Sequence, residues 1–280
     1  MSPTGEPGSS GGIFEALREA LLGEEPVALA TVVRTDPASV ARGTRLGSKL
    51  LVRPGLMTIG TLGDAELDRV VARDALGSLE LATSVARHYG AAGEARREDV
   101  TVFVESFAPP PRLIIFGAVD FTGALARVGK VLGYRVTVCD ARPIFATVSR
   151  FPAADEVVVE WPDRYLRKVG ESLGIRDAVC VLTHDSKFDV PAVLAALETR
   201  VGYIGAMGSR RTHEDRLQRL VEAGADPEEL AARIWSPIGI DIGARTPEET
   251  AVSICAEIIA RRSGRSAPSL RDARGAIHER

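Results

Sequence analysis

Two different hydrophobic patterns follow one another along the chain, and they meet at residues 108–111. In the first part, apolar residues recur at helical spacing in two stretches and form short β-rich runs between them. This pattern predicts a small α+β domain over residues 13–107. The expected elements are a helix over 13–22, strands over 26–34, 48–52, 56–59 and 100–107, a loop through 36–43, and a helix after Gly63 that includes Leu67, Val71 and Leu76.

The boundary itself is Ala108-Pro109-Pro110-Pro111, because three prolines in a row fit neither a helix nor a central strand. Beyond it, continuous apolar runs alternate with helical stretches, as in a parallel sheet covered by helices on both faces. With right-handed crossovers, the pattern predicts a Rossmann-like α/β domain over residues 112–262. Strands are expected over 113–116, 135–139, 156–160, 178–182 and 201–204, and helices over 124–132, 190–197 and 227–234, from Ser209, and from a Thr246 cap to Arg262.

The flanking segments and the overall composition narrow the class of protein. Residues 1–12 and 263–280 are polar or rich in Gly, Ser and Pro, and we expect both to be disordered. A net charge of -3 gives no support for a nucleic-acid partner, and no apolar run approaches the length of a membrane span. The N-terminus lacks the features of a signal peptide, so a cytoplasmic protein is expected. The three cysteines lie in apolar runs and are expected to be buried free thiols.

The stretch YIGAMGSRRTH, residues 203–213, is the first candidate for chemistry. A strand leads into a glycine turn at Gly205 and Gly208, and a helix begins at Ser209-Arg210-Arg211. Backbone amides at a helix N-terminus attract anions, and arginines bind phosphate with two parallel hydrogen bonds. The stretch therefore predicts an anion site, although a βα turn with solvated arginines would have the same residues.

A second candidate, GAVDFTG at 117–123, follows the first strand of the second domain. Gly117 and Asp140 stand where a dinucleotide fingerprint places its first glycine and its ribose-binding acid. The middle glycine is replaced by Val119, and Asp120 would bring a negative charge near the phosphates. NAD(P) binding is therefore disfavoured, and a βα turn without ligand explains the residues as well.

Two further loops carry polar residues that could contact a ligand. His184 and Asp185 follow a central strand and could act as an acid or base and its orienting partner, or simply cap the next helix. Asp241 lies between two glycines in a loop that could contact a ligand or plug the core. No familiar metal-ligand spacing is present, so we expect no metal site. Together these loops predict a pocket for a small molecule that carries phosphate.

Four segments of the second domain carry a resemblance to a known family. They are RFPAADEV at 150–157, VLTHDSKFD at 181–189, YIGAMGSRRTH at 203–213 and PIGIDIGARTPEETAVSICAEIIA at 237–260. The chain resembles the XdhC/CoxI family, accessory proteins of molybdenum hydroxylases such as xanthine dehydrogenase and aerobic carbon monoxide dehydrogenase. The resemblance implies a non-catalytic protein that binds molybdenum cofactor transiently, assists its sulfuration with a cysteine desulfurase, and inserts it into a hydroxylase client.

Several loops depart from the family's pattern. Residues 36–40 replace a glycine-serine-proline-arginine type segment, Gly63-Asp64-Ala65 replaces Gly-Gly-Cys, and GAVDFT at 117–122 replaces GAGHVA. The resemblance places the phosphate of the ligand at Gly208, Ser209, Arg210 and Arg211, with His184, Asp185 and Asp241 around it. Two other hypotheses remain: an NAD(P)-dependent oxidoreductase, and a structural adaptor that has lost its ligand. For the accessory protein, a homodimer is expected.

Overall fold

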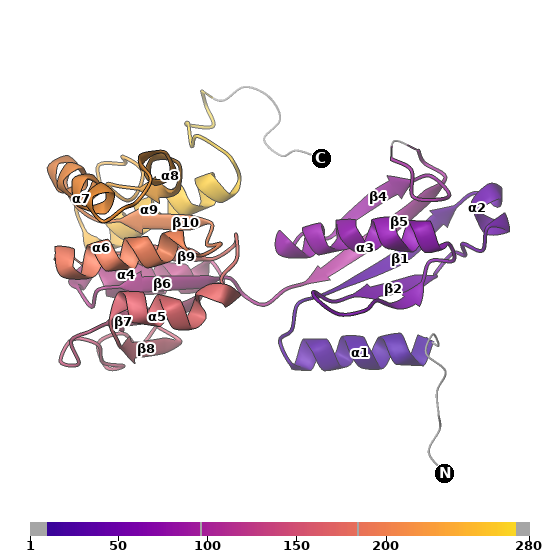
Figure 1. Cartoon of the computed structure of the whole chain (residues 1–280), viewed down its shortest axis with the longest axis horizontal. Helices are drawn as coiled ribbons and strands as arrows, with labels where there is room; N and C mark the ends of the chain where they lie inside the picture. Colours follow the sequence, from indigo (N-terminus) through magenta and orange to yellow (C-terminus); the bar gives the residue numbers. More distant parts are fainter. Residues whose placement is uncertain (1–9, 96, 184, 273–280) are drawn as a thin grey trace, which may run out of the picture. The chain divides into compact units, whose positions relative to one another are not determined.

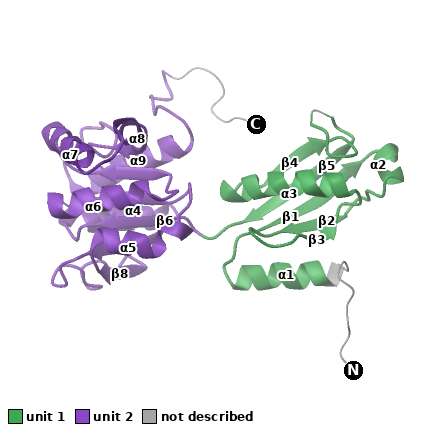
Figure 2. Ribbon diagram, in the orientation of Figure 1, with its two compact units in different colours: residues 1–109 green, residues 110–280 purple. Residues whose placement is uncertain are grey.

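The computed structural model describes residues 10–95, 97–183 and 185–272. The chain divides into two compact units, residues 1–109 and residues 110–280 (Figure 2). The expectation of disorder for residues 1–9 and 273–280 lies outside the described residues. Ser10 to Gly12, which were expected to belong to the disordered segment, form the start of the first helix.

The first unit is an antiparallel sheet of five strands in the order β3-β2-β1-β5-β4 (Figure 1). Alternate residues of β1 point to opposite faces, so Ala28 and Ala30 pack under α3 while Val27 and Leu29 pack against α1. Its elements are α1 Ser10–Leu22, β1 Val27–Thr35, α2 Pro37–Ala41, β2 Lys49–Val52, β3 Ile59–Thr61, α3 Ala65–Glu80, β4 Val85–Tyr89 and β5 Val100–Phe107.

The second unit is a parallel sheet of six strands in the order β11-β10-β9-β6-β7-β8. Helices α4 and α9 cover one face, and α5, α6 and α7 cover the other (Figure 1). Its elements are β6 Arg112–Phe116, α4 Asp120–Val131, β7 Arg135–Asp140, β8 Glu156–Val159, α5 Pro162–Val169, the 3-10 turn η1 Gly170–Ser172, β9 Ala178–Val181, α6 Ser186–Leu197, β10 Tyr203–Ala206, α7 Arg210–Glu222, α8 Pro227–Arg233, β11 Ile234–Trp235 and α9 Pro247–Arg262.

This strand order confirms the Rossmann-like fold expected from the sequence. The chain runs outward from β6 through β7 to β8, then returns to the centre and runs from β9 to β11 on the other side. The strand order therefore reverses between β6 and β9. In open α/β sheets, ligands bind at this point, beyond the carboxyl ends of the strands.

Several elements differ from those expected. Residues 37–41 form a helix rather than a loop, because Asp36 caps it and Pro37 takes the first position, where a missing N–H costs nothing. Helix α4 begins at Asp120, and α6 begins at Ser186, each about one turn earlier than the apolar pattern indicates. The pattern also missed β4, α5 and β11, which are short or lie at the sheet edges.

The remaining expectations about burial and membranes have clear outcomes. Cys139, Cys180 and Cys255 are buried free thiols, as expected. Burial raises the pKa of both the Cys139 and the Cys255 thiol to about 12, so both are protonated at neutral pH. Over the described ranges, none of the helices has the length and apolar character needed to cross a bilayer.

Candidate functional site

The loops after β6 and β9 touch at the point where the strand order reverses. Gly117 has φ +106°, and a Cβ there would lie 2.9 Å from Thr183 Cγ2 and 3.0 Å from the Thr183 nitrogen. Both the backbone angle and the close approach therefore require glycine. The contact holds the loops after β6 and β9 together at the point where the strand order reverses.

The backbone N–H groups of the turn after β6 donate to atoms of the protein itself. The Ala118 N–H donates to Asp140 Oδ2 at 2.8 Å, and the Val119 N–H donates to Thr122 Oγ1 at 3.4 Å. The Thr122 hydroxyl in turn donates to the Gly117 carbonyl oxygen at 2.5 Å. A dinucleotide fingerprint presents such amides to a pyrophosphate. Here these two are already hydrogen-bonded inside the loop.

Both carboxylate oxygens of Asp140 also accept hydrogen bonds from Arg142. Arg142 donates from its backbone N–H and its Nε to Oδ1, each at 2.9 Å, and from Nη2 to Oδ2 at 2.8 Å. Burial disfavours the carboxylate, but the hydrogen bonds from Arg142 and Ala118 outweigh it and lower the pKa of Asp140. The acid expected to bind a ribose is thus ionised and paired with a guanidinium.

The helix start expected at Ser209 is confirmed and forms an open, positively charged turn. Ser209 Oγ accepts the Thr212 N–H at 3.1 Å and caps α7. Gly208 has φ +150°, and a Cβ there would meet Thr212 Cβ at 3.0 Å. Arg210 and Arg211 are exposed, and among the described residues neither guanidinium has a hydrogen bond or ion pair. The helix dipole and two uncommitted arginines together suit an anion.

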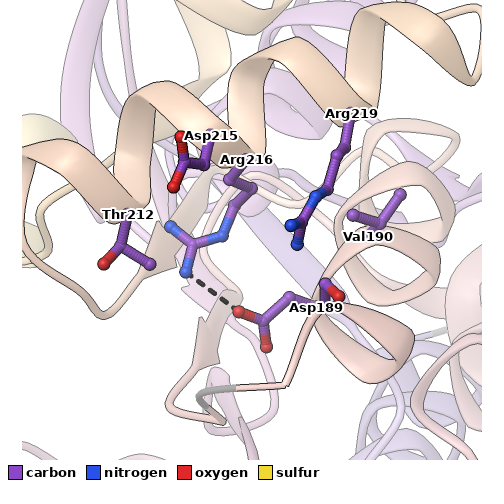
Figure 3. A pocket seen from close by; sticks show the side chains of 7 residues that line it. Asp189, Val190, Thr212, Asp215, Arg216 and Arg219 are labelled. Carbon is purple, nitrogen blue, oxygen red and sulfur yellow. Dashed lines mark hydrogen bonds and ion pairs between the residues drawn. The ribbon is translucent and has the colours of Figure 1, made fainter.

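A buried ion pair, which the sequence reasoning missed, lies beneath this turn (Figure 3). Arg216 Nη2 lies 2.9 Å from Asp189 Oδ2, and the two side chains are 4% and 5% exposed. The same guanidinium donates to the Met207 carbonyl oxygen at 2.6 Å and to Ser236 Oγ at 3.0 Å. The Thr183 hydroxyl donates to the other oxygen of Asp189. One arginine of α7 thus joins the first turn of α6 to the loops that follow β10 and β11.

A signal for this pair is present in the sequence. Arg216 lies four residues before the buried Leu220, on the face of α7 that packs into the core. An arginine on an apolar face indicates a buried carboxylate partner, because an unpaired buried charge is costly. His213 lies one turn earlier on the same face. Burial lowers its pKa, and the nearby Arg216 charge lowers it further.

Two other candidate residues are exposed and hydrogen-bonded within their own turns, and a third is not described. Asp185 is exposed; it caps α6 by accepting the Lys187 N–H at 3.1 Å, and it pairs with Lys187 Nζ at 3.1 Å. Asp241 is exposed and accepts the Gly243 N–H at 3.3 Å within its own turn. His184 lies outside the described residues. In the described ranges, no group of three or more His, Cys, Asp or Glu side chains is arranged to hold a metal ion.

The first unit contains one tight loop pair of its own. Gly43 and Gly63 both have positive φ, and a Cβ on Gly63 would clash with the Gly43 carbonyl group. Asp64 caps α3 and accepts two hydrogen bonds from Arg42, at 3.1 and 2.6 Å. The departure at residues 63–65 thus replaces a Gly-Gly-Cys pattern with a cap and an ion pair.

Comparison with known proteins matches both units. Residues 113–258 match the family model described as the XdhC Rossmann domain, and residues 20–90 match the model described as the XdhC and CoxI family. The chain is 35% identical over 162 residues to a probable xanthine dehydrogenase component of Bacillus subtilis, covering 58% of this chain and 46% of that protein. It is 32% identical over 156 residues to "Molybdenum cofactor insertion chaperone PaoD" of Escherichia coli, covering 56% and 42%.

The chain therefore spans less than half the length of these curated relatives. Among solved structures, a xanthine dehydrogenase from Bacillus halodurans is 20% identical with a TM-score of 0.49, covering 91% of this chain and 98% of that one. The Rossmann-domain match covers more than half of the chain, and the second match lies in the first unit. The chain belongs to the XdhC and CoxI family.

Proposed function

We propose that this protein is a non-catalytic accessory factor that binds molybdenum cofactor and assists its insertion into a molybdenum hydroxylase. Family membership supports the proposal, as does similarity to one relative named as a xanthine dehydrogenase component and another named as a cofactor insertion chaperone. The carrying observation is the uncommitted Arg210 and Arg211 pair on the first turn of α7.

The chemistry of this turn fits the phosphate end of the cofactor. The dipole of α7 and two guanidinium groups offer positive charge, Ser209 caps the helix, and Gly208 supplies the positive φ of the turn. The buried Asp189–Arg216 pair holds the Met207 carbonyl beneath the turn. When bound, the cofactor would supply the metal chemistry of the client enzyme. The residues of this chain would bind and orient it.

The proposal extends to details carried by the family resemblance. The client is of the xanthine dehydrogenase or carbon monoxide dehydrogenase type, and the protein assists cofactor sulfuration by a cysteine desulfurase. Ala65 occupies the position where the family has cysteine, so in this account sulfur transfer depends on the desulfurase and not on a thiol at that position. The protein works in the cytoplasm as a homodimer.

An NAD(P)-dependent oxidoreductase is the main alternative. The strand order favours it, but the occupied amides of Ala118 and Val119 and the paired Asp140 count against it. A structural adaptor that has lost its ligand is the other alternative. Titration with NAD(H) and NADP(H) in a calorimeter separates the first, since an oxidoreductase requires binding in the range from micromolar to millimolar.

The direct experiment mixes the protein with cofactor released from a molybdenum enzyme and separates the two by gel filtration. Cofactor that co-elutes with the protein supports the accessory role. Free elution of all cofactor, together with normal capture of a hydroxylase client, would favour the adaptor. Light scattering in the same run gives the oligomeric state.

A further inference from the structure

A ladder of cations and aromatic rings lies beside Asp140, beyond the carboxyl end of β7. Arg150 lies 5.7 Å from the Phe145 ring centre, and Arg142 lies 4.5 Å from the same ring. Arg142 is also 5.9 Å from the Phe188 ring, whose centre lies 5.0 Å from that of Trp161. We call these five residues the ladder. Its members come from the segment after β7, from the N-cap of α5 and from the start of α6.

The ladder is open to solvent except at Phe188, which is 5% exposed. The side chain of Arg142 is 43% exposed, and Phe145 and Trp161 are 38% and 39% exposed. Arg150 donates to the carbonyl oxygens of Ala118 and Phe145, and the described residues include no carboxylate paired with it. An exposed guanidinium and exposed rings form a surface on which another planar group can stack.

The hydrogen bonds around Asp140 prevent it from binding a ribose in the usual way. In dinucleotide-binding domains, the acid at the end of the second strand accepts hydrogen bonds from ribose hydroxyls. Here both oxygens of Asp140 already accept from Arg142, and Oδ2 also accepts from Ala118. A ligand beside Asp140 therefore meets the guanidinium of Arg142, whose Nη1 has no partner among the described atoms.

We propose that the ladder binds the ring of a planar nitrogen heterocycle that carries phosphate, and that it makes no hydrogen bond to ribose hydroxyls. The proposal rests on the proposed function, because such a ring is either the pterin of the cofactor or the base of its dinucleotide form. Stacking on an arginine or aromatic ring tolerates either ring, since both have a π face.

The position of the ladder suits a ligand that also reaches Arg210 and Arg211. Strands β10 and β7 are three places apart in the sheet order. At the usual spacing of about 4.8 Å between strands, their carboxyl ends lie roughly 14 Å apart. One end of an extended ligand could therefore lie on the ladder while a phosphate lies at the turn of α7.

The test is a calorimetric titration of the full chain with five probes. They are CMP, 2′,3′-dideoxy-CMP, 6-hydroxymethylpterin diphosphate, ribose 5-phosphate and inorganic phosphate. We expect CMP and its dideoxy analogue to bind within about twofold of each other, because both oxygens of Asp140 already accept hydrogen bonds from the protein. Ribose 5-phosphate should bind about tenfold more weakly than the probes with a ring. If only one kind of ring binds, that kind is the source of the natural ligand.

Two variants and a matched control separate the ladder from general folding. Phe145→Ala and Arg142→Lys should each weaken binding of the ring probes about tenfold and leave inorganic phosphate unchanged. Ile144→Ala removes a more exposed apolar neighbour outside the ladder and should change neither. Arg142→Lys could unfold the protein by exposing Asp140. In that case Phe145→Ala still tests the ladder, and thermal melting checks that this variant is folded.

Three results would overturn the proposal. They are a loss of about tenfold or more with the dideoxy analogue, equal binding by native protein and both variants, and binding of inorganic phosphate alone. Failure of the proposed function gives a different result, because released cofactor then elutes separately from the protein in gel filtration. If cofactor is retained and Phe145→Ala binds rings as well as native protein, the ladder alone is wrong.

Discussion

At the scale of single residues, the second unit depends on two carboxylate–guanidinium pairs that serve different purposes. Asp189 and Arg216 are both buried, and they join α6 and α7 to the loops after β10 and β11. Asp140 is buried, but its partner Arg142 reaches solvent. The first pair braces the turn of α7, and the second neutralises an acid while it presents a guanidinium to solvent. Buried charges of this kind are tolerated because each is hydrogen-bonded to an opposite charge.

Removing Arg216 should show how much the brace contributes. Arg216→Met leaves Asp189 buried without its cation, so we expect unfolding free energy to fall by about 3–5 kcal/mol in urea denaturation. Arg219→Met, at an exposed position in the same pocket, should change it by less than about 0.5 kcal/mol. The double change Asp189→Leu/Arg216→Met should cost less than the sum of its parts. A small effect of Arg216→Met would show that the brace is not structural.

Asp140 should give the protein a specific dependence on acid. Burial works against its ionisation, yet hydrogen bonds from Arg142 and Ala118 lower its pKa in the folded state. Its contribution to stability is therefore complete above the ordinary aspartate pKa of about 4, and is lost as pH falls through the lower folded value. The stability difference between native protein and Asp140→Asn should shrink below about pH 4. A difference that stays constant from neutral pH to acid would contradict this sign.

At the scale of elements, a close contact holds the loops after β6 and β9 together where the strand order reverses. Gly117→Ala adds both an unfavourable φ and a clash with Thr183. Gly133→Ala is a matched control, because Gly133 also has positive φ but has nothing within 4 Å of an added Cβ. We expect about 1 kcal/mol of destabilisation for Gly133→Ala and clearly more for Gly117→Ala, measured by urea denaturation. Equal costs would mean that the loops separate easily.

The sequence predicts the elements that have a strong local signal. Continuous apolar runs predicted the parallel sheet, and the Thr246 capping box predicted the start of α9. The pattern missed β4 because three of its five residues are exposed, and it missed β11 because two residues carry no periodicity. The caps at Val119 and Asp185 begin helices one turn before the apolar stripe does. The pattern of apolar residues therefore predicts the first residues of α4 and α6 too late in the sequence.

Only part of the candidate site could be predicted from the sequence. The capped turn at Ser209 is local in sequence and could be predicted. The Asp140–Arg142 pair is equally local, but its effect depends on side-chain orientation. The ladder and the Asp189–Arg216 brace join residues from separate loops, so they require the packed sheet. A charged residue on an apolar helix face, as at Arg216, is the sequence signal that indicates a buried partner.

At the scale of the whole molecule, each compact unit has a core of its own. The cores of the first unit contain only residues up to Ala108, and those of the second begin at Leu113. We predict that residues 10–109 and 110–272, produced separately, each unfold cooperatively by circular dichroism. The second fragment should retain the binding of ring probes. A second fragment that is folded and does not bind would show that the site needs the first unit.

The central claim is that the carboxyl edge of the second unit holds molybdenum cofactor through Arg210 and Arg211. Equilibrium binding of released cofactor to native protein, Arg210→Ala/Arg211→Ala and Arg69→Ala/Arg73→Ala tests it most directly. The control pair removes the same charge from exposed positions on α3. We predict a loss of about tenfold or more for the first pair, reduced at high salt, and no loss for the control. Equal binding by all three proteins, or no binding by native protein, would contradict the account.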